Sequence, residues 1–244
     1  MESKTPFLSF SFIRNLPKDS SISVQIRPLE AKDLTEVSLL LAKNLPERHP
    51  YWIGNGLTSS ELYPFLHIKM DVFLSEGFSI VAIHNQKIIG FVGAYDFACI
   101  KINDFYDKLW EKYPLLKKKY QPFGKKENDL IDFQKPKERG NAIMINSLVV
   151  DGDYEGKGLG YILMDFVNYH PKVKEYSKFL VKFSAKASEV IGIKLGFQIV
   201  RKNKWEDYVN DDNDEETWKN LPEKLKEKGL SADNDGIALA VLKK

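Results

Sequence analysis

The hydrophobic positions in the first third of the chain predict one strand followed by two helices. Residues 22–26 alternate apolar and polar side chains, which is typical of a half-buried strand. Residues 31–44 carry leucine and valine at helical spacing, and the proline that opens the segment 46–55 is expected to end this helix and begin a loop. Residues 58–61 form a capping sequence for a second helix, which is expected to end before Gly77.

The middle of the chain predicts a hairpin and a buried strand. Two apolar runs, 78–83 and 88–95, flank a short polar turn and read as antiparallel strands. Residues 142–150 are almost continuously apolar, as expected of a strand that is buried on both faces. Between them, the Lys- and Tyr-rich segment of about 101–140 interrupts the pattern and is interpreted as an insertion.

The last third continues the alternation of helices and strands. The expected elements are a helix at 161–169, a strand at 179–183, a helix at 188–195, and strands at 197–208 and 237–242. This order predicts a mixed α/β fold whose sheet has about seven strands and is flanked by helices. We expect an N-terminal arm over 1–21 and a single domain over 22–244, with a second, acidic and Lys-rich excursion at about 209–235.

Composition excludes several classes of protein. The 244 residues carry 36 Lys and Arg against 34 Asp and Glu, a net charge of +2, which argues against nucleic-acid binding. The single cysteine, Cys99, excludes an internal disulfide and a Cys-rich zinc cluster, and no histidine has metal-ligand spacing, so we expect no metal. The chain has no apolar run of roughly 18 residues and no convincing signal peptide, so we expect it to be cytoplasmic and not bound to a membrane. We also expect a monomer or weak homodimer.

Three glycines mark the junction between the strand 142–150 and the helix that follows it. Gly156, Gly158 and Gly160 allow close approach of the backbone and direct N–H groups at an anion, so a phosphate is the expected ligand. The spacing is one residue too short for a Walker loop, and it differs from GxGxxG. The alternative is a glycine-rich turn with only a structural role.

This turn resembles the acyl-CoA loop of the GNAT acetyltransferase superfamily, whose pattern is Gln/Arg-x-x-Gly-x-Gly/Ala after a hydrophobic strand. The order of elements over 22–244 is also similar to that superfamily. The resemblance implies acetyl-CoA as co-substrate, a mostly antiparallel sheet, and a central strand that splays from its parallel neighbour, 179–183. It implies co-substrate contacts at Leu148, Val149, Val150, Glu155, Gly156, Lys157, Gly158, Leu159 and Gly160. Glu155 stands where the family has Gln or Arg, which removes a side-chain contact to phosphate.

The C-terminal third is similar to the insect-type arylalkylamine N-acetyltransferases. The likeness lies in residues 184–197 and 235–244. By this resemblance Ser184 and Ser188, four residues apart, would polarise or protonate the departing thiolate of CoA; the alternative for Ser188 is a helix N-cap. The position at which many GNAT enzymes carry a tyrosine acid is Gly192 in this chain.

An alkylamine must lose a proton before it attacks a thioester, so such an enzyme needs a base. The insect-type enzymes use a glutamate before a proline after the first helix, and this chain offers Glu47 and His49 there; both remain candidates. Tyr51 and Trp52 would line an aryl pocket, or else belong to the core.

The resemblance therefore implies direct transfer of acetyl from acetyl-CoA to a small-molecule primary amine, with an arylalkylamine favoured. The alternatives are an acetyltransferase for polyamine, amino-acid or protein amines, and a catalytically silent CoA-binding regulatory protein.

Overall fold

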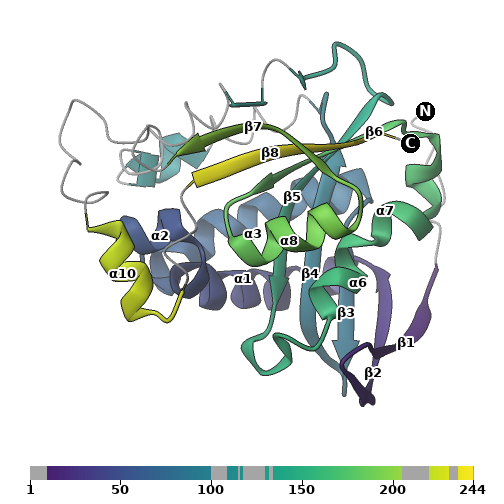
Figure 1. Ribbon diagram of the computed structural model, residues 1–244, viewed down its shortest axis with the longest axis horizontal. Helices are drawn as coiled ribbons and strands as arrows, with labels where there is room; N and C mark the ends of the chain where they lie inside the picture. The colour runs from purple at the N-terminus through teal and green to yellow at the C-terminus, as the bar shows by residue number, and fades with distance from the viewer. Residues whose placement is uncertain are drawn as a thin grey trace.

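The computed structural model describes residues 10–99, 109–114, 116–117, 130–131, 134–204, 220–230 and 236–243. Its centre is a mixed sheet with strands in the order β1-β2-β3-β4-β5-β6-β8-β7 (Figure 1). The strands are β1 (Phe12–Leu16), β2 (Asp19–Pro28), β3 (Ile80–His84), β4 (Lys87–Asp96), β5 (Ala142–Val150), β6 (Lys178–Phe183), β7 (Gln198–Lys204) and β8 (Gly236–Lys243). All neighbours are antiparallel except β5 and β6, which confirms the predicted mixed sheet with its parallel pair.

The described residues form an eight-stranded sheet, one strand more than the sequence predicts. The additional strand is β1, which pairs with β2 inside the segment expected to be an arm. Leu16 at the end of β1 is only 1% exposed, so burial of its side chain helps to hold this edge strand. β2 extends beyond the predicted range of 22–26 at both ends, because it pairs with β1 on one side and β3 on the other.

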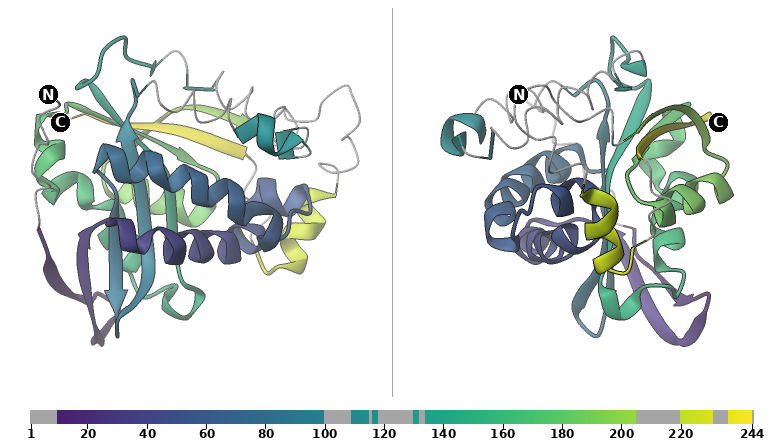
Figure 2. Two further views of the ribbon diagram at one scale, coloured as in Figure 1. Left: turned by 180° about the vertical axis from the view of Figure 1, so that it is seen from behind. Right: turned by 60° about the vertical axis from the view of Figure 1, so that its left-hand side comes forward.

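Helices cover both faces of the sheet (Figure 2). The α-helices are α1 (Leu34–Arg48), α2 (Pro50–Gly54), α3 (Ser59–Glu76), α6 (Leu159–Met164), α7 (Phe166–Tyr169), α8 (Lys186–Lys194) and α10 (Leu221–Glu227), and short 3₁₀ turns are η1 (Ala31–Asp33), η3 (Gly152–Tyr154) and η4 (Pro171–Glu175). Helices α1 and α3 pack on one face, and α6, α7 and α8 lie on the other. Two apolar clusters, one under each layer, therefore share the central strands.

Local sequence explains where several of these elements begin and turn. Thr58 and Glu61 form the predicted capping box at the start of α3, each side chain accepting the other's backbone N–H. Asn85 and Gln86 have positive φ angles of 49° and 64°, which suit a two-residue hairpin between β3 and β4. The predicted hairpin is confirmed.

The prediction that Pro46 ends the first helix is wrong. Helix α1 continues through Pro46 to Arg48. Proline removes only its own N–H from the ladder, and the amide of His49 still donates to the carbonyl of Leu45 at 2.9 Å, so the last turn closes.

The expected loop over 46–55 is also wrong, because residues 50–54 form the short helix α2. Pro50 occupies its first turn, where a missing N–H costs no hydrogen bond. His49 precedes it in an extended conformation and serves as the N-cap. The chain thus passes from one helix into another with a single extended residue between them.

The helix predicted at 161–169 begins earlier and is divided. Helix α6 begins at Leu159, and Asp165 separates it from α7. The predicted strand at 197–208 is β7 from residue 198 to Lys204. Residues 205–208 lie outside the described ranges, as do most of the insertion and the whole acidic run.

Candidate active site

A bulge in β5 opens the middle of the sheet. Gly93 and Ala94 of β4 pair with Ser147 and Ile145, so Asn146 is an extra residue on β5. A bulge bends its strand and increases the local twist. The parallel pairing of β5 with β6 ends at this point, with Ile145 opposite Val181 as its last pair. The expected splay of the parallel strands is therefore present.

The part of β5 beyond its pairing with β6 contains the residues that the family resemblance assigns to the co-substrate. Leu148, Val149 and Val150 still pair with β4, but within the described residues they have no partner on the β6 side. Leu148 and Val150 are half-buried and Val149 is buried. The backbone edge that faces away from β4 is thus available to hydrogen-bond an extended molecule.

The glycine turn follows this strand and begins α6. Among the described residues, the N–H groups from Gly156 to Gly160 donate to no backbone carbonyl, because the first helical bond of α6 runs from Ile162 to Gly158. Gly156 has a φ of 73°, and a Cβ placed on it would meet nothing within 4 Å. The turn is consequently open on the side of Gly156.

The other two glycines serve packing. Gly158 has a φ of 91°, and a Cβ there would lie 2.9 Å from Cδ of Pro17 in the β1–β2 turn. A Cβ on Gly160 would lie 3.2 Å from Cδ1 of Ile191, because α6 and α8 approach closely at this point. The structural alternative therefore accounts for Gly158 and Gly160, while the open face belongs to Gly156.

Asp151 fixes the start of the turn. Its carboxylate is 2% exposed, pairs with Lys87 at 2.9 Å and accepts the N–H of Asp153 at 3.2 Å. Burial acts to raise the pKa of Asp151, but the Lys87 ammonium and the Asp153 amide outweigh it and lower that pKa. A carboxylate held in this way keeps the chain in one conformation as it leaves the sheet.

The charged residues of the turn are paired with distant segments. The Glu155 carboxylate lies 3.1 Å from the guanidinium of Arg48 at the end of α1. Lys157 lies 3.4 Å from Asp19 of β2, and its ammonium also stands over the ring of Tyr154. Each pair connects the turn to a different element.

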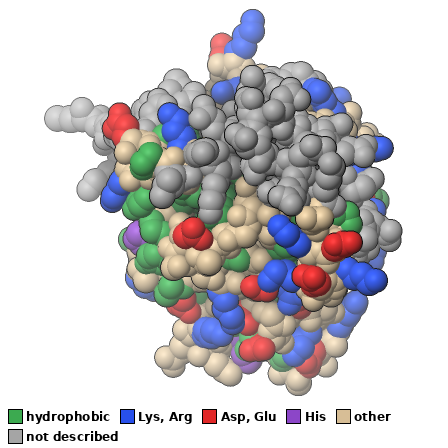
Figure 3. Space-filling view, turned by 90° about the vertical axis from the view of Figure 1, so that its left-hand side faces the viewer, with side chains coloured by type: hydrophobic (Ala, Val, Ile, Leu, Met, Phe, Trp, Pro, Cys, Tyr) green, Lys and Arg blue, Asp and Glu red, His purple; other side chains and the backbone are tan. Residues whose placement is uncertain are grey.

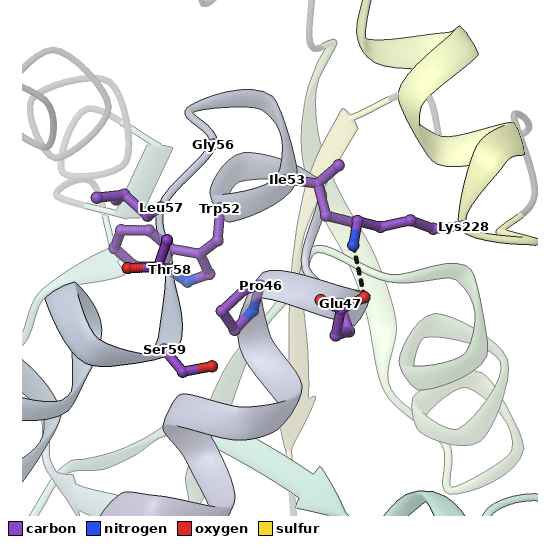
Figure 4. A pocket seen from close by; sticks show the side chains of 9 residues that line it. All are labelled: Pro46, Glu47, Trp52, Ile53, Gly56, Leu57, Thr58, Ser59 and Lys228. Atoms are coloured by element: carbon purple, nitrogen blue, oxygen red, sulfur yellow. Dashed lines mark hydrogen bonds and ion pairs between the residues drawn. The ribbon is translucent and has the colours of Figure 1, made fainter.

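A pocket of about 340 Å³ lies beside the end of α1 (Figure 4). Its lining residues are Pro46, Glu47, Trp52, Ile53, Gly56, Leu57, Thr58, Ser59 and Lys228. Lys228, which follows α10, pairs with Glu47 at 2.5 Å, and Lys224 donates to the carbonyl of Gly54 at 3.1 Å. Acidic and basic side chains are interspersed on this side of the molecule (Figure 3). The C-terminal excursion therefore supplies one wall of the pocket.

The two candidate bases have different surroundings. Glu47 is exposed and lines the pocket. His49 is half-buried, and its Nδ1 accepts the N–H of Tyr51 at 3.3 Å as the N-cap of α2. In a neutral ring that accepts at Nδ1 the proton resides on Nε2, so His49 can take up a second proton only by giving up the cap. Glu47 is not a cap, but its carboxylate is paired with Lys228 at 2.5 Å, and the ammonium group of an acceptor would have to displace Lys228.

The two aromatic candidates, Tyr51 and Trp52, also differ in their surroundings. Tyr51 is 1% exposed and belongs to the core, where its ring meets Trp52 edge to face at 4.7 Å. Trp52 is also buried but contributes to the pocket lining. Only Trp52 stands where it can contact a pocket ligand.

The two serines flank the start of α8. Ser184 lies outside the helix, because Ala185 is its extended N-cap. The alternative that Ser188 is the N-cap is wrong: Ser188 lies in the first turn and its hydroxyl donates to the Ala185 carbonyl at 2.7 Å. Spacing by four residues does not place the two hydroxyls on one helical face, since the chain between them is partly extended.

Cys99 takes no part in this region. It is 5% exposed, and its thiol donates to the buried carboxylate of Glu76 at 3.1 Å, which also pairs with Arg139 at 2.6 Å. The same described part of the chain contains no group of three or more His, Cys, Asp or Glu side chains placed to share a metal ion. None of its helices combines the length and apolar character needed to span a bilayer.

Sequence reasoning missed Arg48, Lys228 and Pro17, which contact the candidate residues from distant parts of the chain. The one indication in the sequence was Glu155, which stands where the resemblance expects Gln or Arg. Its negative charge beside a phosphate site predicts a nearby cation that neutralises it. That signal does not identify which of 36 Lys and Arg residues fills the role.

The bulged and splayed central pair, the glycine turn and the helices on both faces together constitute the GNAT fold. Among solved structures, an arylalkylamine N-acetyltransferase from Aedes aegypti has a TM-score of 0.62 at 18% identity, over 90% of this chain and 98% of that chain. The Drosophila melanogaster polyamine N-acetyltransferase has a TM-score of 0.61 at 16% identity, over 91% and 100%. The C-terminal condensation domain of Ebony, solved with beta-alanyl-dopamine, has a TM-score of 0.64 at 10% identity, over 91% and 100%. No protein-family model and no curated protein sequence matches the chain.

Proposed function

We propose that the protein is an acetyl-CoA-dependent N-acetyltransferase that transfers acetyl directly to a small primary amine, with an arylalkylamine as the favoured acceptor. The observation that carries the proposal is the free edge of β5 running into the open glycine turn. Similar structures include N-acetyltransferases for arylalkylamines and polyamines, which supports this reaction class.

The residues at the turn suit the phosphates of acetyl-CoA. Within the part of the chain that the structure describes, the backbone amides of 156–160 have no backbone acceptor, and the space beside Gly156 is open to an anion. The edge of β5 at Leu148 to Val150 would bond the pantetheine arm as a neighbouring strand does. An amide on that edge could also stabilise negative charge on the thioester oxygen.

Glu47 is the favoured base. It would take a proton from the ammonium group of the acceptor, and the freed nitrogen would attack the thioester carbonyl carbon. The bond from that carbon to sulfur then breaks, the thiolate leaves, and the proton that remains on the attacking nitrogen passes to it, so that the products are the amide and free CoA thiol. A thiol has a pKa of about 8.5, so its departure requires only modest help. Ser184 and Ser188 are the candidates, and Ser188 would have to release the Ala185 carbonyl in order to donate.

The pocket beside Glu47 is the proposed acceptor site. Trp52, Ile53 and Leu57 form its apolar part, beside Thr58, Ser59 and Lys228. The Glu47 carboxylate would bind an ammonium group in place of Lys228. A pocket with one acidic and one aromatic side chain in its lining favours an arylalkylamine over a polyamine, whose several cations need several acidic partners. Lys228 in the same pocket opposes a second cation as well.

A combined binding and turnover assay tests the proposal. Acetyl-CoA should raise the melting temperature because it binds the native state, and thiol release should follow the addition of an arylalkylamine. Absence of any shift with acetyl-CoA would remove the proposed function. A shift without thiol release from a panel of arylalkylamines, polyamines and amino acids would instead favour the silent CoA-binding alternative.

A further inference from the structure

We infer that Arg48 binds the phosphates of acetyl-CoA, and that Glu155 holds its guanidinium beside the glycine turn before the co-substrate arrives. The inference rests on the proposed function and names a contact that the motif itself lacks. Arg48 lies at the C-terminal end of α1, and its Nη2 is 3.1 Å from Oε2 of Glu155.

The other cations at the turn are bound differently. Lys87 pairs with Asp151, which is 2% exposed, so that pair belongs to the framework of the turn. Lys157 is engaged by Asp19 and by the ring of Tyr154. Arg48 and Glu155 have side chains that are 46% and 40% exposed, and an ion pair exposed to that degree contributes little stability and exchanges readily.

The guanidinium group suits the task. Its planar N–H fork matches phosphate oxygens in pairs, and a diphosphate carries more negative charge than one carboxylate. An arriving diphosphate at residues 156–160 therefore competes well with Glu155 for Arg48. Glu155 immediately precedes Gly156, so the guanidinium that it holds starts next to the turn.

Glu155 alone would oppose binding. Its carboxylate adjoins the amides that would hold the phosphates, so the negative charges of the carboxylate and of the phosphates would repel each other. Arg48 therefore has two effects, neutralising Glu155 and donating to the ligand. These two effects can be separated by substitution.

Calorimetric titration with acetyl-CoA measures both. Arg48→Gln should weaken binding about tenfold, since it removes a charged donor and leaves Glu155 uncompensated. Glu155→Gln should tighten binding about threefold. The double variant Arg48→Gln/Glu155→Gln should bind more weakly than Glu155→Gln alone, because it lacks the direct contact. Arg48→Lys, which keeps the charge without the fork, should fall between wild type and Arg48→Gln.

The pair Lys32–Glu30, at the opposite end of α1, provides the matched control. Lys32→Gln removes an exposed, paired cation and should leave affinity unchanged. Raising the salt concentration should reduce the difference between wild type and Arg48→Gln. The inference is overturned if Arg48→Gln binds like wild type, or if the double variant binds as tightly as Glu155→Gln. If wild type itself does not bind acetyl-CoA, the proposed function fails instead.

Discussion

Gly192 of α8 lies against the ring of Phe183 at the end of β6. A Cβ on Gly192 would be 2.0 Å from Cζ of Phe183, closer than side chains can approach. Any larger residue is therefore excluded while Phe183 keeps its place. The tyrosine that many GNAT enzymes carry at this position cannot be accommodated, so under the proposed function the thiolate would be protonated by another group or leave unassisted.

Gly192→Ala should destabilise the protein by about 2 kcal/mol. Alanine favours a helix by about 1 kcal/mol over glycine, but overpacking against a buried ring costs more. Urea denaturation would measure the change in the free energy of unfolding. Phe183→Leu in the same background should recover part of the loss, whereas a Gly192→Ala variant as stable as wild type would contradict this contact.

Stability should fall in acid because of His170. This residue is 2% exposed, its Nδ1 accepts the N–H of Lys172, and burial lowers its pKa to about 4 from 6.5. The unfolded chain takes up a proton near pH 6.5 and the folded protein does not until about pH 4, so stability decreases as the pH falls through this window. The difference corresponds to about 3 kcal/mol.

Denaturation curves between pH 7 and pH 4 test this expectation. His170→Asn keeps an acceptor for the Lys172 amide but cannot titrate, so its stability should depend less on pH than that of wild type. His84→Asn, in the β3–β4 hairpin, is the control and should retain the wild-type slope. Equal slopes for all three proteins would show that burial of His170 does not contribute.

The two candidate bases should respond differently to substitution. Glu47→Gln removes the proton acceptor and should lower kcat by roughly 10²-fold or more, with loss of the ascending limb of the pH profile. His49→Asn preserves the cap of α2 and should retain most activity. Steady-state kinetics across pH would decide, and a severe loss in His49→Asn alone would reverse the assignment.

Substitutions at two glycines of the turn should affect acetyl-CoA binding and protein stability differently. Gly156→Ala costs about 1 kcal/mol through its positive φ angle, yet the methyl group enters the open face and should weaken acetyl-CoA binding. Gly158→Ala meets Pro17 and should lower the melting temperature further. Calorimetry and thermal unfolding of both variants measure the two effects. Equal affinity in Gly156→Ala and wild type would count against phosphate binding at this turn.

Local patterns predicted the elements that depend on nearby residues. The capping box at Thr58, the buried strand β5 and the glycine turn each follow from a few consecutive side chains. The continuation of α1 through Pro46 is not predictable from the proline alone, because one lost hydrogen bond in a last turn is tolerated where the amide of His49 still finds an acceptor. Pro50 then starts α2 instead of prolonging a loop.

The candidate site was harder to predict because its contacts join distant segments. Glu47 meets Lys228 and Glu155 meets Arg48 only after the chain folds, and charge spacing along the sequence does not encode either pair. The bulge at Asn146 is likewise invisible in an apolar run, since it depends on the register with β4. The sequence therefore indicates the glycine turn and the end of α1 as parts of the candidate site, but it does not predict the Arg48–Glu155 ion pair that connects them.

The parting of β5 from β6 also bears on how long the protein survives. Strand edges exposed to water open more easily than paired ones, and opened regions are where proteases cut. A thioester ligand bonded along the edge of β5 would close this gap and lower the population of opened molecules by mass action. If acetyl-CoA is the ligand, as proposed, its presence should therefore slow the proteolysis of the folded protein.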